Sequence, residues 1–129
     1  GWHVPSHYEF VKLEREVCGS DPDCAAEFPY QENTTGWRGT DQEVGTALKE
    51  GGTSGLNVKM SGFYITGNFV LGEMDPVVDY PRARIWTTTP HTTAGHNEYT
   101  TRKFYSDRTG ISWDQIDADA ALPVRCIKD

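Results

Sequence analysis

The three cysteines of this 129-residue sequence carry its most readily interpreted chemistry. Cys18 and Cys24 enclose Gly-Ser-Asp-Pro-Asp, a turn-forming stretch that can bring their Cα atoms within disulfide distance. The spacing predicts a local disulfide, and the alternative is two free thiols in a reducing compartment. A metal site would need further Cys or His ligands at suitable spacing. Cys126 is the odd cysteine, which indicates a partner outside the sequence.

The four histidines form two pairs that could in principle bind a metal ion. His3 and His7 are four residues apart, but Pro5 lies between them and the helix predicted below begins only after it. His91 and His96 flank Thr-Thr-Ala-Gly, a loop-forming stretch. The sequence has no HExxH pattern. We therefore expect no metal site, and we interpret His91 and His96 as solvated or hydrogen-bonding loop residues.

The carboxylates near the C-terminal end offer a second possible cation site. Asp114, Asp117 and Asp119, with Asp107 upstream, could supply oxygen ligands to Ca²⁺. Their spacing lacks the central Gly and the terminal Glu of an EF-hand loop. A solvated acidic loop is the favoured interpretation, with calcium as the alternative. Since the sequence shows no recognisable set of acid, base and nucleophile, we expect no catalytic residues, no enzyme activity and no cofactor.

The charge balance narrows the classes of partner. Nineteen acidic residues against 12 Lys and Arg give a net charge of -7 and a pI near 5.0. This charge repels phosphate backbones and anionic lipid surfaces, so neither nucleic acid nor membrane contact is expected. The basic pairs Arg82 with Arg84 and Arg102 with Lys103 are interpreted as ordinary surface charges.

The two ends of the sequence indicate a longer protein. No apolar run approaches the roughly 18 residues of a membrane span. The first residues, Gly-Trp-His-Val-Pro, lack the basic-then-apolar pattern of a secretory signal. Because the sequence opens abruptly on a patterned segment, we expect a mature or excised part of a longer protein whose anchoring segment is elsewhere.

Two helices are predicted in the N-terminal half. Ser6 and Glu9 form a capping box for a helix over 7–17, which Gly19 ends. One face of this helix is apolar, with Phe10, Leu13 and Val17. Residues 20–39 contain turn-forming residues and show no sustained hydrophobic periodicity, so they are predicted to be irregular.

The second helix is predicted from another capping box, Thr40 with Glu43, and continues to Lys49 before Gly51 and Gly52. Gly45 inside it costs about 1 kcal/mol relative to Ala, so its stability must come from packing.

Short strands are predicted after Gly55, where β-branched and aromatic residues gather. Their ranges are 58–60, 63–66, 69–71, 84–88, 99–105 and 124–127. Residues 73–81 are predicted to form a surface loop. Helices segregated before strands indicate an α+β fold, with two N-terminal helices packed on a C-terminal antiparallel sheet and long irregular loops. The length favours one domain over residues 1–129.

Five short blocks in order along the chain resemble one known family. They are Gly-Trp-His-Val-Pro-Ser (1–6), Thr-Gly-Trp-Arg-Gly-Thr-Asp-Gln (35–42), Leu-Lys-Glu-Gly-Gly-Thr-Ser-Gly-Leu (48–56), Trp-Thr-Thr (86–88) and Val-Arg-Cys-Ile-Lys-Asp (124–129). Together they resemble the Fibrobacter succinogenes major paralogous domain family over essentially the whole chain. The resemblance implies a C-type-lectin-like fold, similar to the formylglycine-generating enzyme superfamily, and no known activity.

The resemblance also implies a location and an architecture. Such domains are extracellular or cell-surface modules of bacteria, appended to surface lipoproteins and type IV pilin-like proteins. Residues 1–129 would then be the C-terminal part of a longer surface protein. Family members usually carry a Cys shortly before the Gly-Trp-His block, which would be the natural partner of Cys126.

The resemblance suggests roles for the tryptophans. Trp2, Trp37 and Trp86 lie inside family blocks and are therefore expected to be mainly core residues, although aromatic faces can also stack on sugars. The role of Trp113 stays open.

The function predicted from these observations is a non-catalytic surface interaction or adhesion module. It would bind a glycan or a protein through variable loops, with Asp75, Asp79, Asn97 and Asp107 as candidate ligand-binding residues. The alternative is the globular headgroup of a pilin-like filament subunit, whose main partner is a further copy of itself.

Overall fold

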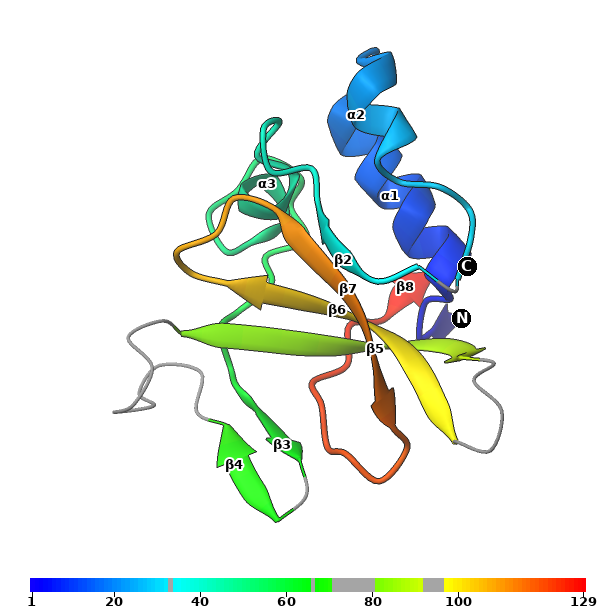
Figure 1. Cartoon of the computed structure of the whole chain (residues 1–129), viewed down its shortest axis with the longest axis vertical. Helices are drawn as coiled ribbons and strands as arrows, with labels where there is room; N and C mark the ends of the chain where they lie inside the picture. Colours follow the sequence, from blue (N-terminus) through cyan, green and yellow to red (C-terminus); the bar gives the residue numbers. More distant parts are fainter. Residues whose placement is uncertain (33, 66, 71–80, 92–96) are drawn as a thin grey trace.

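The computed structural model describes the chain except for residues 33, 66, 71–80 and 92–96 (Figure 1). Asp75, Asp79 and His96 therefore lie outside the described residues. The architecture is α+β, as predicted, with few helices and an antiparallel sheet. The helices are α1 (His7–Cys18), α2 (Pro22–Ala26) and α3 (Val44–Leu48). None of the helices in the described part of the chain is long and apolar enough to cross a membrane.

Helix α1 begins and ends as its sequence predicts. The Ser6 hydroxyl accepts a hydrogen bond from the Glu9 N–H at 3.3 Å, and the Glu9 carboxylate accepts one from the Ser6 N–H at 2.8 Å. Gly19, at φ 62°, donates its N–H to the Glu16 carbonyl at 3.1 Å and ends the helix. The capping box is thus confirmed, and the helix runs one residue beyond the predicted end.

The disulfide predicted between Cys18 and Cys24 is confirmed, with the two Cα atoms 5.6 Å apart. Its second cysteine lies in α2, a five-residue helix inside the segment predicted to be irregular. The Asp21 carboxylate accepts hydrogen bonds from the N–H groups of Asp23 and Cys24, and Pro22 occupies the first turn. The prediction missed α2 because five residues are too few to show a helical period.

Helix α3 is shorter than predicted. Residues 40–43 form turns, with the Glu43 N–H bonded to the Thr40 carbonyl at 3.2 Å, so the second capping box is wrong. Gly45 lies against the turn at Gly110, where a Cβ would come within 2.2 Å of the Gly110 carbonyl oxygen. This glycine is required by close packing.

The main sheet has four antiparallel strands in the order β2-β7-β6-β5. Their bounds are Gly36–Arg38 (β2), Arg82–His91 (β5), Glu98–Tyr105 (β6) and Ile111–Asp117 (β7). Strands β5 and β6 extend the predicted ranges 84–88 and 99–105. Strand β7 corrects the predicted acidic loop, because Asp114 and Asp117 lie within it.

Two short ribbons complete the fold. Trp2–His3 (β1) pairs with Ile127–Lys128 (β8), which places the two chain ends side by side (Figure 1). Phe63–Ile65 (β3) pairs with Asn68–Val70 (β4). The strand predicted at 58–60 is a single bridge from Val58 to Lys49.

The hydrophobic core draws on all three helices and on three strands of the main sheet. Its members are Phe10, Val11, Cys24, Phe28, Val44, Leu48, Val58, Ala83, Ile85, Phe104, Ile111 and Trp113. Leu13 and Val17, which were predicted on the buried face of α1, are only partly buried. The more buried positions of α1 include two polar residues, His7 and Glu14.

A buried ion pair joins α1 to the sheet. The Arg102 Nε lies 2.6 Å from Glu14 Oε1, and both side chains are fully buried. The Trp113 indole N–H donates to the same oxygen at 3.2 Å. The indole ring lies between two guanidinium groups, with Arg102 Cζ at 4.3 Å and Arg38 Cζ at 4.2 Å from its ring centroid. Burial raises the pKa of the Glu14 carboxyl, while Arg102 and the indole N–H oppose that shift.

Removing one member of this pair should cost much more stability than removing both. Glu14→Ala leaves Arg102 buried and unpaired, so we expect a loss of about 3–5 kcal/mol in urea unfolding. Glu14→Met combined with Arg102→Met should be milder, because no charge is left buried. Glu16→Ala, on the exposed side of the same helix, is the matched control. A loss below 1 kcal/mol for Glu14→Ala would contradict this role.

Candidate functional site

The pleat of the sheet divides the residues of β6 between two faces. Arg102 and Phe104 are buried on the inner face, so Lys103 and Tyr105 lie on the opposite, outer face. Strand pairing places Arg82 opposite Tyr105 and Trp37 opposite Ser112, whose other neighbour is Lys103. Strands β5 and β6, together with the sequence-distant β2, therefore bring aromatic and basic side chains to one outer face.

Trp37 and Tyr105 form the aromatic part of this face. Their ring centroids are 5.3 Å apart with an interplanar angle of 45°. Trp37 is 41% exposed, so its predicted role as a core residue is wrong. An exposed indole next to a second ring provides a flat apolar area that can stack on a ligand ring.

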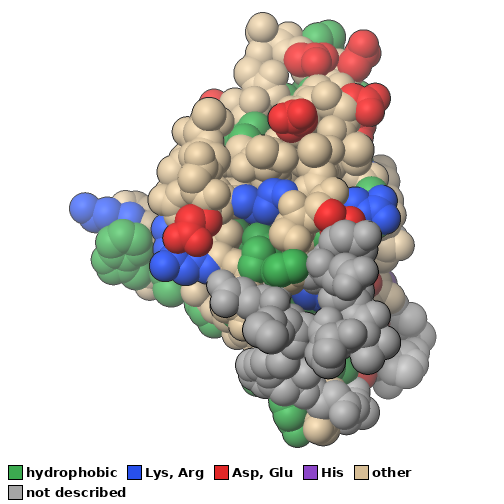
Figure 2. Space-filling model, turned by 90° about the vertical axis from the view of Figure 1, so that its left-hand side faces the viewer, with side chains coloured by type: hydrophobic (Ala, Val, Ile, Leu, Met, Phe, Trp, Pro, Cys, Tyr) green, Lys and Arg blue, Asp and Glu red, His purple; other side chains and the backbone are tan. Residues whose placement is uncertain are grey.

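Three cations surround the two rings. Arg82 Cζ is 5.2 Å and Lys103 Nζ 5.8 Å from the Tyr105 centroid, and Arg108 Cζ is 5.5 Å from the Trp37 centroid. We call these five residues the Trp37–Tyr105 surface. Figure 2 views the molecule from the side of the β6–β7 turn, where Lys, Arg and hydrophobic side chains lie beside one another.

The three cations differ in how far they are neutralised. Lys103 Nζ is 3.0 Å from Asp114 Oδ2, whereas Arg108 Nε is 3.8 Å from Asp107 Oδ2 and its side chain is 61% exposed. Within the described part of the chain, the Arg82 guanidinium makes no hydrogen bond or ion pair, and its Nε is buried. Arg82 and Arg108 are thus the cations most available to a ligand.

The β6–β7 turn, which carries Arg108, is fixed by hydrogen bonds from Lys49 and to Pro81. Lys49 Nζ donates hydrogen bonds to the carbonyl of Tyr105 at 3.0 Å and to that of Arg108 at 2.6 Å. The Ser106 N–H donates to the Pro81 carbonyl at 2.8 Å, which ties the turn to the start of β5. Burial lowers the pKa of Lys49, and nearby Asp107 opposes this shift. These bonds fix the backbone of the surface before a ligand arrives.

The structure separates the basic pairs that were predicted to be ordinary surface charges. Arg102 is fully buried, and Arg84 is 6% exposed. Arg84 donates to Thr101 Oγ1 and the Gln115 carbonyl and lies 3.1 Å from Asp114 Oδ2. Only their partners, Arg82 and Lys103, keep contact with solvent, so the surface-charge interpretation is wrong for Arg84 and Arg102.

The four candidate ligand-binding residues do not form one described site. Asp107 is exposed in the β6–β7 turn and adjoins the Trp37–Tyr105 surface. Asn97 is exposed at the opposite end of β6, where its carbonyl accepts the Ala118 N–H at 2.9 Å. Asp75 and Asp79 are outside the described residues.

The other tryptophans also differ from their expected roles. Trp113, whose role the sequence left open, is 2% exposed in the core. Trp2 is 70% exposed on β1. Trp86 is half-buried on the outer face, 6.0 Å from Tyr99 between ring centroids. The expectation of core packing is therefore wrong for Trp2.

His3 and His7, which were considered as metal ligands, have other partners. His3 contacts Glu9 and Asp129, whereas His7 is buried and faces Arg102 and Trp113. Burial, together with Arg102 and Arg38, lowers the pKa of His7 to about 4. Across the described ranges, no group of three or more His, Cys, Asp or Glu residues could hold a metal ion.

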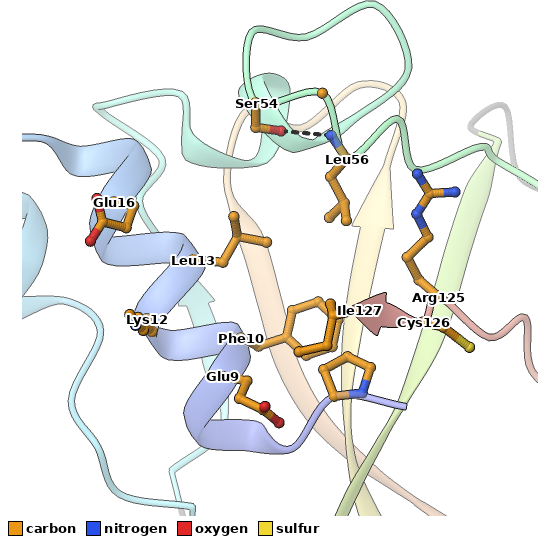
Figure 3. Close-up of a pocket in the computed structure, with 12 residues that line it drawn as sticks. Glu9, Phe10, Lys12, Leu13, Glu16, Ser54, Leu56, Arg125, Cys126 and Ile127 are labelled. Carbon is orange, nitrogen blue, oxygen red and sulfur yellow. Dashed lines mark hydrogen bonds between the residues drawn. The ribbon is translucent and has the colours of Figure 1, made fainter. Parts of the chain in front are cut away.

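A groove of about 500 Å³ lies between α1, residues 54–56 and the C-terminal segment. Figure 3 shows Phe10, Leu13, Leu56 and Ile127 facing one another across it. Its lining is mainly apolar, with charged residues at its margin. Cys126 also lines the groove and is an exposed free thiol.

Comparison of the chain with family models, curated proteins and solved structures gives no match.

The pKa of His3 should lie above its ordinary value of 6.5, because hydrogen bonds to the Glu9 carboxylate and, to a lesser degree, to the Asp129 carboxylate stabilise the protonated ring. A raised pKa stabilises the fold below pH 6.5, and this contribution is lost as the pH rises through the folded-state value. NMR titration of His3 gives the pKa directly. The stability difference between wild type and His3→Gln should shrink from pH 5.5 to pH 8.5. A His3 pKa below 6.5 would exclude this contribution.

Cys126 should be the one thiol that reacts in the native protein, because Cys18 and Cys24 are paired. A maleimide reagent should label one site per chain without reductant and three after reduction and denaturation. Cys126→Ser should abolish native labelling. Native labelling of Cys18 or Cys24 would contradict the disulfide.

Proposed function

We propose that this chain is a non-catalytic recognition domain of the bacterial cell surface that binds a glycan or a protein. The observation that carries the proposal is the Trp37–Tyr105 surface, an exposed aromatic pair flanked by cations on a hydrogen-bonded turn. Aromatic residues and Arg are the residue types that most often dominate recognition surfaces. Asp107, in the β6–β7 turn, extends the proposed contact region beside Arg108.

The proposed location is extracellular. The Cys18–Cys24 disulfide supports it, since such bonds persist in oxidising compartments. We further propose the C-type-lectin-like fold implied by the family resemblance, with the two helices predicted from the sequence, α1 and α3, packed on the sheet. The α+β architecture, with few helices and an antiparallel sheet, is compatible with it.

The non-catalytic part of the proposal is supported by where the buried charges lie. Glu14 and Arg102 are paired within the core, and the apolar groove carries charges only at its margin. Catalysis by acid and base groups needs such groups gathered around a substrate.

The proposal predicts that Trp37 is needed for binding. Screening wild type and Trp37→Ala against immobilised glycans and surface proteins should give ligands that the variant binds at least tenfold more weakly. Trp2→Ala removes an even more exposed indole from the β1–β8 ribbon and is the matched control. Its binding should stay within twofold of wild type, and both variants should keep the wild-type Tm within about 2 °C.

Two outcomes would overturn the proposal. Equal binding by Trp37→Ala and wild type would remove the Trp37–Tyr105 surface from recognition. Filaments of the native full-length protein in electron microscopy, with no ligand found in the screen, would favour the headgroup of a filament subunit.

A further inference from the structure

We infer that the Trp37–Tyr105 surface takes a short acidic saccharide, with a sugar ring on Trp37 and carboxylates of the saccharide at Arg82 and Arg108. This inference rests on the proposed recognition function and names its ligand class. It is carried by local charge, by the Arg82 guanidinium, which has no acceptor among the described residues, and by the exposed indole.

The local charge of this face is opposite to that of the chain. The net charge of the protein is -7. Among the described residues around the two rings, however, the cations Arg82, Lys103 and Arg108, with the buried Arg84, face two carboxylates, those of Asp107 and Asp114. The surface is therefore a basic area in an acidic molecule, and charge complementarity selects an anionic ligand.

Arg82 is the strongest individual argument for that ligand. Asp114 already serves both Arg84 and Lys103, at 3.1 and 3.0 Å. Arg82 has the Tyr105 ring beside it at 5.2 Å but no hydrogen-bond acceptor among the described residues. A guanidinium with free donors matches the geometry of a carboxylate, which can bind through two parallel hydrogen bonds.

The indole favours a saccharide over a peptide. A peptide would most readily add to the free edge of β2, but that strand has only three residues. The neighbouring Arg38 would not assist a peptide on the outer face, because its side chain donates a hydrogen bond to the Glu27 carbonyl at 3.2 Å on the other face of the sheet. Trp37 offers a flat apolar face, against which the C–H face of a sugar ring can pack.

A long polyanion fits less well than a short saccharide. Nucleic acid presents many closely spaced phosphates to the negative field of the whole chain. A short acidic sugar presents a single carboxylate per ring and contacts only the basic area. The hydrogen bonds from Lys49 hold the Arg108 turn in place, so the surface is ordered before binding.

The test uses trigalacturonate and its fully methyl-esterified form, which share a carbon skeleton but differ in charge. Calorimetric titration of the wild-type chain should give binding of trigalacturonate at least tenfold tighter than binding of the ester, weakening as salt rises. Arg82→Gln and Trp37→Ala should each weaken trigalacturonate binding at least tenfold. Arg82→Lys, which keeps the charge but loses the planar fork, should lie between Arg82→Gln and wild type. Lys128→Gln removes an exposed cation from β8 and should change binding less than twofold.

The outcomes separate this inference from the proposed function. Equal affinity for the acid and the ester, with Trp37→Ala still impaired, would overturn the acidic class and leave recognition of neutral glycans. Tighter binding of triglutamate than of trigalacturonate would overturn the saccharide class. Absence of binding by every saccharide and protein in the screen would overturn the proposed function itself. Melting curves confirm that each variant is folded.

Discussion

The buried ion pair between Arg102 and Glu14 is the interaction on which the rest of the arrangement depends. Charges removed from water need partners, and here α1 supplies the carboxylate while the sheet supplies the guanidinium and the Trp113 indole N–H. The pair therefore fixes which face of β6 is turned toward α1. Because successive strand residues alternate in direction, Lys103 and Tyr105 are then directed to the outer face. The basic aromatic surface is a geometrical consequence of burying Arg102.

A second constraint operates at the β6–β7 turn. Helix α3 approaches this turn so closely that Gly45 can have no side chain, and the Thr46 N–H donates to the Thr109 carbonyl at 3.1 Å. Lys49 at the end of the same segment binds the carbonyls on either side of the turn. A helix remote in sequence thus determines where Arg108 is held relative to Trp37.

The two termini and Cys126 lie apart from the Trp37–Tyr105 surface. The β1–β8 ribbon brings the two chain ends together, and the exposed Cys126 lies at the apolar groove beside α1. The groove and the Trp37–Tyr105 surface draw on different residues. Cysteine chemistry and recognition can therefore be tested independently in this chain.

The sequence by itself determined the features that depend on a few neighbouring residues. The Ser6–Glu9 capping box, the end of α1 at Gly19, the Cys18–Cys24 disulfide and the centres of β5 and β6 all follow from local signals. Such signals also placed the protein in the α+β class. The same signals predicted too long a helix for α3. The Thr40–Glu43 spacing matches a capping box, but in the structure these residues form turns and the helix begins at Val44.

Only the tertiary structure decided which charged and aromatic residues are inside. Arg102 and Lys103 are adjacent in sequence, and the neighbouring residues give no signal that Arg102 is fully buried while Lys103 lies on the outer face. The acids of β7 suggested a solvated loop until pairing with β2 and β6 placed them in a strand. Trp37 and Trp113 lie on the paired strands β2 and β7, yet Trp37 is 41% exposed and Trp113 only 2% exposed. The physical reason is that burial of a charge or a ring depends on partners supplied by distant segments, which short-range patterns do not encode.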